Sequence, residues 1–385
     1  MNSRKALTGP EDYKSWDKLI QHCSEIEGLT DFEKEKAKRA FLFLKQEFGE
    51  PFLGQVFIDR HPFGFNIINT APWTRKWITW FAEAVKSLRD SDGFGSLLKR
   101  LKDKDRYVEA ESVLEVAYRL SRAGFQIAFD PQALENKKVP DLRINNEEKN
   151  EELFVEISIQ RQSLARIKSM ATMDAITKPL WLSFPFLNYC GIVHKALSEK
   201  HLVEISREVE KAVERMKAQD AFEELIIEGT LELGLSPDKD RDVLAKWASS
   251  RGIKTGELIG PGIDENELHR TKMKIQKEQN QLPRSNPNIL VINDTNLFFG
   301  LRDIRMGMSE LEECVYEFPH LLFAIITGSS LGGPESMTLM KDQHVFVKKT
   351  RYDVLVEQSM ILLNRYCSFN ISPATISKVY LAFGE

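Results

Sequence analysis

Two acidic residues, Asp141 and Glu156, fall where two short predicted strands should pair. Residues 141–144 and 153–157 alternate apolar and polar side chains, and the polar run NNEEKNEE joins them as a hairpin. In simple register Asp141 then faces Glu156. Two carboxylates opposite each other repel and destabilise a sheet, so a cation between them would explain the pairing.

A divalent metal ion held by oxygen ligands is one such cation. Asp141 and Glu156 would bind it, with a third carboxylate and water molecules completing the shell. Such an ion positions and activates a water molecule and stabilises charge during attack on a phosphodiester. From the residues alone an alternative stays open, in which Asp141 is a turn residue and Glu156 pairs with Arg143 or a lysine.

The alternation gives the hairpin an apolar face for the core and a polar face for chemistry. The apolar face carries Leu142, Ile144, Leu153, Val155 and Ile157. The polar face carries Asp141, Arg143, Phe154, Glu156, Ser158 and Gln160. Two uncharged polar side chains therefore lie next to the carboxylates, on the strand that bears Glu156.

The third carboxylate is expected from a helix that precedes the hairpin. Residues 109–122 have helical periodicity, and Gly124 follows where a helix often ends on a left-handed residue. Glu109 extends the inward face of this helix by one turn, whereas Glu111 lies on a more polar side with Glu115. The spacing favours Glu109 as the third ligand and keeps Glu111 as the second choice, and ordinary surface positions are the alternative for both.

These residues, in this order, resemble the PD-(D/E)xK nuclease superfamily, which has the restriction-endonuclease-like fold. The resemblance covers about fifty residues, through a glutamate-bearing helix, Gly-Phe, Val-Pro-Asp-Leu-Arg-Ile and Leu-Phe-Val-Glu-Ile-Ser. Pro140-Asp141 matches the PD, and Glu156 matches the acidic residue of the ExK. The resemblance implies a nuclease that uses Mg²⁺ or Mn²⁺ to hydrolyse phosphodiester bonds of nucleic acid, with DNA as the expected substrate.

The sequence departs from the family pattern at Ser158, where the family has a lysine that orients the attacking water and stabilises charge. A serine cannot supply that charge, and Gln160 is a polar substitute at most. The resemblance implies Ser158 and Gln160 as the variant catalytic positions. Candidates for a migrated cation, which would also contact nucleic acid, are Lys138, Arg161 and Lys168. The alternative is a catalytically inactive nuclease-fold protein that serves for binding or as a scaffold.

Residues 1–105 are predicted to form a helical N-terminal region. A helix with apolar residues at three- and four-residue spacing should end at Gly49, and another should begin at Pro72. The second helix repeats aromatic residues at Trp73, Trp77, Trp80 and Phe81. That stripe is typical of packing against neighbouring helices rather than of base stacking. The N-terminal helices are also a candidate surface for a protein partner.

Residues 106–385 are predicted to form the α/β domain, a restriction-endonuclease-like core with a central mixed sheet flanked by helices. The runs NILVIND, LLFAIITG and HVFVKKT indicate strands, and the first two are apolar enough to be covered on both faces. An insertion of helices and strands is expected around 195–285. Residues 183–197, which lead into the insertion, are predicted to be helical, and residues 222–236 within it are predicted to be strands.

The composition is that of a globular protein, with 42% hydrophobic and 29% charged residues and a net charge of −4. This charge excludes a histone-like protein but allows a local basic groove. The four cysteines lie far apart, as buried reduced thiols would. We find neither a signal peptide nor an apolar run of the ~18 residues that a membrane span needs, so we expect a cytoplasmic protein without membrane contact. Whether it forms a homo-oligomer stays open.

Overall fold

The computed structural model describes residues 7, 9–131, 139–183, 187–262, 267–294, 304–331, 337–341, 344–352 and 354–384. The chain divides into two compact units. The first comprises Met1–Arg161 and Glu267–Glu385, and the second is Gln162–Asn266. The helical region 1–105 therefore belongs to the same unit as the sheet, and the second unit begins and ends earlier than the predicted insertion.

Helices build the N-terminal part of the first unit. They are α1 (Trp16–His22), α2 (Asp31–Phe48), α3 (Phe52–Ile58), α4 (Phe63–Ile68), α5 (Pro72–Leu88) and α6 (Phe94–Lys102), with 3-10 turns at Pro10–Lys14 and Cys23–Glu25. Thr30 and Glu33 form a capping box at the start of α2, and Gly49 ends it with a φ of +89°. The predicted boundaries at Gly49 and Pro72 are confirmed.

The aromatic stripe of α5 packs inside this helical layer. Phe81 is fully buried and Trp77 nearly so, with their rings stacked at 5.1 Å between centroids. Phe63 of α4 lies 5.4 Å from the ring of Phe81. The prediction that these aromatic residues serve packing is confirmed for Trp77 and Phe81, because rings in such contact cannot also stack on bases.

Helix α7 (Tyr107–Arg122) leads into the hairpin through β1 (Gln126–Phe129). Gly124 has a φ of +89°, a left-handed turn that a side chain would strain. The hairpin consists of β2 (Leu142–Asn146) and β3 (Glu151–Gln160), antiparallel, with Leu142 opposite Val155. Its predicted apolar face is confirmed, because Leu142, Ile144, Leu153, Val155 and Ile157 all join one core.

The first unit is built on an eight-stranded mixed sheet. The remaining strands are β8 (Asn288–Asp294), β9 (Leu321–Leu331), β10 (Met337–Lys341), β11 (His344–Arg351) and β12 (Leu355–Leu363), and the order is β1-β2-β3-β8-β9-β12-β11-β10. Strands β3, β8 and β9 are parallel, and the flanking pairs are antiparallel. The predicted strands NILVIND, LLFAIITG and HVFVKKT are confirmed as β8, β9 and β11.

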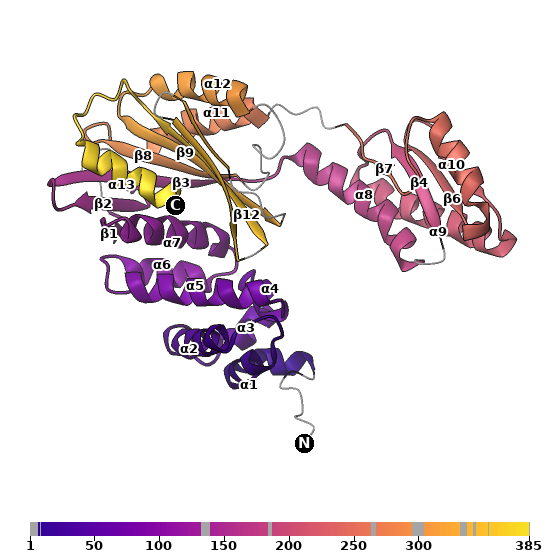
Figure 1. The fold of residues 1–385 in the computed structure, drawn as a ribbon, viewed down its shortest axis with the longest axis horizontal. Helices are drawn as coiled ribbons and strands as arrows, with labels where there is room; N and C mark the ends of the chain where they lie inside the picture. Colours follow the sequence, from indigo (N-terminus) through magenta and orange to yellow (C-terminus); the bar gives the residue numbers. More distant parts are fainter. Residues whose placement is uncertain are drawn as a thin grey trace. The chain divides into compact units, whose positions relative to one another are not determined.

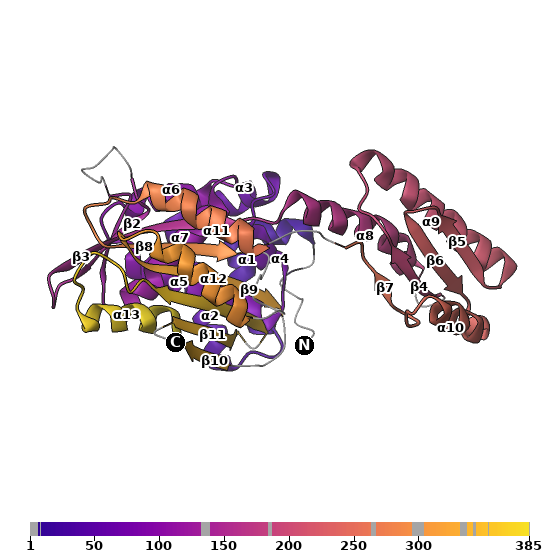
Figure 2. The same cartoon turned by 90° about the horizontal axis from the view of Figure 1, so that it is seen from above.

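Helices cover both faces of this sheet (Figure 1). On one face α7 and α13 (Pro373–Gly384) pack against Val155, Val291 and Phe323. On the other face α11 (Glu267–Glu278) and α12 (Ile304–Tyr316) pack against Phe154, Leu290 and Ile326, and Figure 2 shows both helices lying over the strands. The result is a mixed α/β architecture with a large sheet between helical layers.

The second unit has a sheet of its own, ordered β5-β6-β4-β7. It contains α8 (Leu164–Leu182), β4 (Asn188–Val193), α9 (Glu199–Gln219), β5 (Glu223–Ile227), β6 (Leu231–Ser236), α10 (Arg241–Ser250) and β7 (Leu258–Ile259). The predicted strands within 222–236 are confirmed. The predicted helix over 183–197 is wrong, because residues 188–193 form the inner strand β4. A short apolar run does not distinguish the two by itself.

No helix in the described parts of the chain is both long enough and apolar enough to cross a membrane.

Candidate functional site

Asp141 lies just before β2, at the point where the hairpin brings it next to β3. Its Oδ2 accepts a hydrogen bond from the Ile157 backbone N–H at 2.9 Å, which fixes the carboxylate against the neighbouring strand. Because Leu142 pairs with Val155, the next position along the ladder sets Asp141 against Glu156. The side chain is 18% exposed, and Arg100 Nη1 of α6 lies 3.6 Å from its Oδ1.

Glu156 stands in the middle of β3, between β2 and β8, and only 9% of it is exposed. Alternation places it on the α11 side of the sheet, because its neighbours Val155 and Ile157 join the α7 side. Burial raises the pKa of Glu156, and the negative charges of Asp141 and Glu278 raise it further. The positive charge of Lys274 offsets this rise only in part.

Burial also raises the pKa of Asp141, although less strongly. The Ile157 hydrogen bond and the Arg100 guanidinium oppose this rise, whereas the nearby Asp130 adds to it. Arg100 is shared, since its Nη2 also lies 2.9 Å from Asp130 Oδ1. The two carboxylates thus form a buried pair whose negative charge the surrounding basic residues do not fully neutralise.

Helix α11 supplies a lysine next to this pair. Lys274 Nζ lies 3.0 Å from Glu278 Oε1, and both charges act on Glu156. Burial alone would raise the pKa of Glu278, but the hydrogen bond and charge of Lys274 hold it below its usual value. Lys274 is therefore a positive charge close enough to Glu156 to lower its pKa. The signal in the sequence was weak, because the buried stripe of α11 combines Thr271 and Glu278 with a single apolar residue, Ile275.

Ser158 and Gln160 follow Glu156 on the same face of β3. Gln160 is 4% exposed, and its Nε2 donates to Thr271 Oγ1 of α11 at 3.1 Å. The amide therefore holds β3 against α11. Ser158 is half-buried and pairs in register with Ile292 of β8. These two residues frame the carboxylates, and neither brings a charge.

The predicted third carboxylate does not join the pair. Glu109 is exposed and lies 3.2 Å from Arg161 Nη2, so it does not extend the inward face of α7 as expected. Glu111 faces a recess on the α7 side of the sheet. Throughout the part of the chain that the structure describes, no three Asp, Glu, His or Cys side chains are close enough together to hold a metal ion.

Of the predicted basic residues, neither Arg161 nor Lys168 supplies a cation beside Glu156. Arg161 is exposed, pairs with Glu109, and accepts a hydrogen bond from Arg270 on its carbonyl oxygen. Lys168 is exposed on α8, in the second compact unit. Lys138 lies outside the described residues.

The donor set fits a small, hard cation. Mg²⁺ is commonly held in proteins by one or two carboxylates, with water molecules and substrate phosphates as its other ligands. Asp141 and Glu156 provide two such carboxylates, and their unneutralised charge favours a divalent ion between them. The neighbouring Ser158 hydroxyl and Gln160 amide are oxygen-bearing groups too. Sulfur or imidazole, which softer metals prefer, is not part of this described group.

Comparison of the chain with known protein families, with curated proteins and with solved structures found no match in any of the three.

Proposed function

We propose that this protein is a metal-dependent nuclease that hydrolyses phosphodiester bonds of nucleic acid, with DNA as its substrate. The observation that carries the proposal is the buried Asp141–Glu156 pair on adjoining strands. Two carboxylates whose pKa values both rise through burial disfavour the ionised state unless a cation joins them. A site that binds a divalent ion and a phosphodiester together would supply that cation.

In this proposal each side chain has a defined part. Asp141 and Glu156 would hold Mg²⁺ or Mn²⁺, which when bound acts as a Lewis acid toward phosphate oxygen and makes a bound water more acidic. The Lys274 ammonium would stabilise the negative charge that develops on the phosphate as a water oxygen attacks phosphorus and the bond to the leaving oxygen breaks. Gln160 would keep β3 and α11 in register, so that Lys274 stays beside Glu156.

The restriction-endonuclease-like fold is part of the same proposal. Support comes from the acidic residues on the antiparallel neighbours β2 and β3, from the parallel strand β8 beyond them, and from helices on both faces. Lys274 in the place of the absent lysine would explain how a chain with Ser158 keeps a charged side chain at this position.

A catalytically inactive scaffold is the second candidate, and a specific contact favours it. Arg100 already lies beside Asp141 and Asp130, so a part of the negative charge has an internal partner. In that case the pair would be structural, and the chain would bind neither Mg²⁺ nor Mn²⁺ through Asp141.

The test is cleavage of plasmid DNA and of single-stranded DNA with Mg²⁺ or Mn²⁺, for wild type, Asp141→Ala and Glu156→Ala. We expect both substitutions to abolish cleavage. Glu152→Ala is the matched control, because Glu152 is on the same strand but half-exposed, with Arg143 3.7 Å away. Cleavage that survives both site substitutions would overturn the site. Calorimetry with Mn²⁺ separates the two candidates, since a scaffold should show no binding that depends on Asp141.

A further inference from the structure

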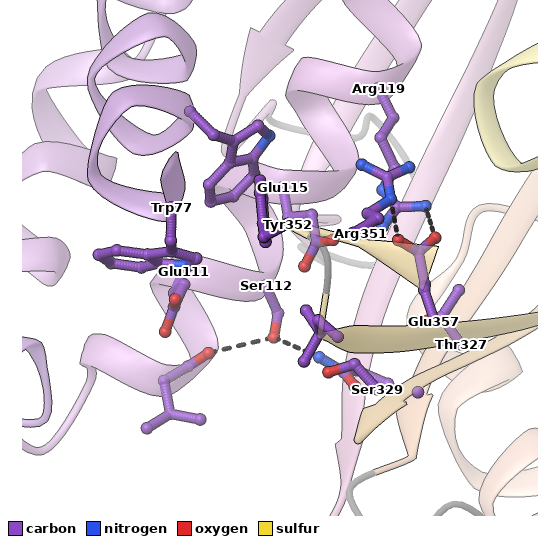
Figure 3. Close-up of a pocket in the computed structure, with 15 residues that line it drawn as sticks. Trp77, Glu111, Ser112, Glu115, Arg119, Thr327, Ser329, Arg351, Tyr352 and Glu357 are labelled. Atoms are coloured by element: carbon purple, nitrogen blue, oxygen red, sulfur yellow. Dashed lines mark hydrogen bonds and ion pairs between the residues drawn. The ribbon is translucent and has the colours of Figure 1, made fainter. Parts of the chain in front are cut away.

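A recess of about 200 Å³ opens on the α7 side of the sheet, whereas Glu156 lies on the opposite, α11 side. Figure 3 shows the residues that line this recess. Helix α7 forms one wall with Glu111, Ser112, Glu115 and Arg119. The strands β8, β9, β11 and β12 contribute Asn293, Thr327, Ser329, Arg351 and Glu357, and α5 contributes Trp77 and Trp80. The recess thus lies at the carboxyl ends of the parallel strands β8 and β9, where α/β sheets commonly bind ligands.

Most charges in the recess neutralise one another. Arg119 bridges Glu115 and Glu357, with Nη1 2.5 Å from Glu357 Oε1, and Arg351 pairs with the other oxygen of Glu357. Glu111 forms no ion pair within the described chain. The lining residues from α5, β8 and β9 are uncharged. Glu111 is therefore the acidic group of this recess that has room for a cationic ligand.

The pKa of Glu111 is raised, as expected for a buried carboxylate without a neighbouring cation. Burial raises its pKa to about 8, the negative charge of Glu115 adds to the rise, and the Tyr107 hydroxyl opposes it. The other titratable groups around it are Arg119 on the same helix, Arg351 and Tyr352 at the end of β11, and Glu357 on β12. A cation seated beside Glu111 would stabilise its ionised form.

The rest of the lining suits a flat cation that carries several N–H groups. Trp80 and Tyr352 offer aromatic rings beside the packed Trp77, and Tyr352 adopts a left-handed backbone with a φ of +52°. Such a conformation is uncommon outside glycine and often occurs at ligand sites. The Thr327 and Ser329 hydroxyls have no hydrogen-bond partner among the described residues and are open as acceptors. A guanidinium group stacks on aromatic rings and pairs with a carboxylate through two parallel N–H donors.

We propose that this recess binds a small organic cation with a guanidinium head group, paired with Glu111 and covered by the aromatic rings. This site is independent of the proposed nuclease, because it uses other residues on the other face of the sheet. The cation is either a free small molecule or the head group of an arginine side chain, and the two sources share the same recognition chemistry.

The test is a titration of the metal-free full chain with methylguanidinium, followed by ligand-observed NMR and calorimetry. N-methylurea is the matched probe, because it has nearly the same shape without the charge. We expect methylguanidinium to bind and N-methylurea not to. Because the cation favours ionised Glu111, its affinity should rise about tenfold per pH unit from about pH 6 toward pH 8, while the probe itself stays charged.

Three variants sharpen this titration. Glu111→Gln should weaken binding at least ~10-fold at about pH 8 and remove the pH dependence, and Thr327→Val should weaken it about 5-fold through one lost acceptor. Glu109→Gln, which removes the same charge from the exposed side of the helix, should bind as wild type does. Equal binding by Glu111→Gln and wild type, or equal binding of N-methylurea and methylguanidinium, would overturn the proposal.

Blocked arginine, with acetyl and amide ends, identifies the source of the cation. Binding tighter than that of methylguanidinium would support an arginine side chain of a peptide. Binding equal to or weaker than that of methylguanidinium would support a free small cation. Because no metal and no nucleic acid is present, a failure of the nuclease proposal leaves this result unchanged.

Discussion

The two faces of the large sheet each hold a carboxylate with a raised pKa, but in different surroundings. On the α11 face, Glu156 meets a second carboxylate across the strands, and Lys274 lies close to it. On the α7 face, Glu111 has an aromatic wall and neutral hydroxyls around it. The first arrangement leaves negative charge in excess at one point, which suits a divalent metal ion. The second leaves a single charge with space beside it, which suits a monovalent organic cation.

The largest expected effect concerns Lys274. In the proposed nuclease, Lys274→Ala removes the charge that would stabilise the developing phosphate charge, so kcat should fall about 100-fold or more while KM changes little. Lys274→Arg should restore part of kcat, because it keeps the charge. Lys277→Ala is the matched control, since Lys277 is on the same helix but 76% exposed, and it should cleave as wild type does. If Lys274→Ala kept the kcat of wild type, Lys274 would have no role in the mechanism.

The second prediction uses stability to compare the faces. Because the folded protein raises the pKa of Glu156, the folded state keeps a proton that the unfolded state has lost, and stability falls as pH rises above the unfolded value. Glu156→Gln removes this penalty. In metal-free buffer we expect the variant to gain about 2 kcal/mol of unfolding free energy over wild type at about pH 8, and much less near pH 5.

Added Mn²⁺ should reverse the order. The ion stabilises the folded wild type by binding to it and cannot do so as well in Glu156→Gln, so wild type should become the more stable protein. Denaturant melts at two pH values, with and without Mn²⁺, measure both effects. A variant that is less stable than wild type under every condition would mean that Glu156 is held by partners that favour its ionised form.

The third prediction applies the same test to the α7 face with a smaller expected effect. The pKa of Glu111 rises to about 8, so the folded state loses stability between the unfolded pKa near 4.5 and pH 8. Glu111→Gln should therefore gain about 1–2 kcal/mol at about pH 9 and almost nothing at pH 5, with the gain reduced by the access of water to the recess. Mn²⁺ should change the stability of wild type and of this variant equally. If Mn²⁺ stabilised wild type and Glu111→Gln by different amounts, Glu111 would take part in the same metal site as Glu156.

On the α11 face, the sequence predicts the hairpin that carries Asp141 and Glu156, but not the residues of α11 that lie beside it. The hairpin follows from period-two alternation, so the register that sets Asp141 against Glu156 needs only local information. Lys274 lies more than a hundred residues further along the chain, after a second compact unit, and the spacing of residues does not reveal such proximity. In addition, the buried side of α11 cannot be recognised from hydrophobic periodicity, because two of its buried residues, Thr271 and Glu278, are polar.

The α7 face was harder because its recess combines several elements. The helix itself was predicted, but a rotation of one or two positions decides whether Glu109 or Glu111 faces inward. The other walls come from the ends of β8, β9, β11 and β12. Strand β12 and helix α13 were not predicted, since the mixed polar run LVEQSMILL combines buried Glu357 and Gln358 with apolar residues. Glu357 is buried there because Arg119 and Arg351 pair with it.

The smallest expected change in stability is that of Glu109→Ala. The same variant tests whether Glu109 belongs to the metal site formed by Asp141 and Glu156. The Glu109–Arg161 pair is exposed on both sides, and exposed pairs contribute about 0–1 kcal/mol, so Glu109→Ala should change the unfolding free energy by less than ~0.5 kcal/mol. Its Mn²⁺ affinity, measured by calorimetry beside Asp141→Ala, should equal that of wild type. A loss of Mn²⁺ affinity in Glu109→Ala comparable to that in Asp141→Ala would mean that α7 closes toward the carboxylate pair when metal binds. Asp141, Glu156 and Glu109 would then form one centre of three carboxylates.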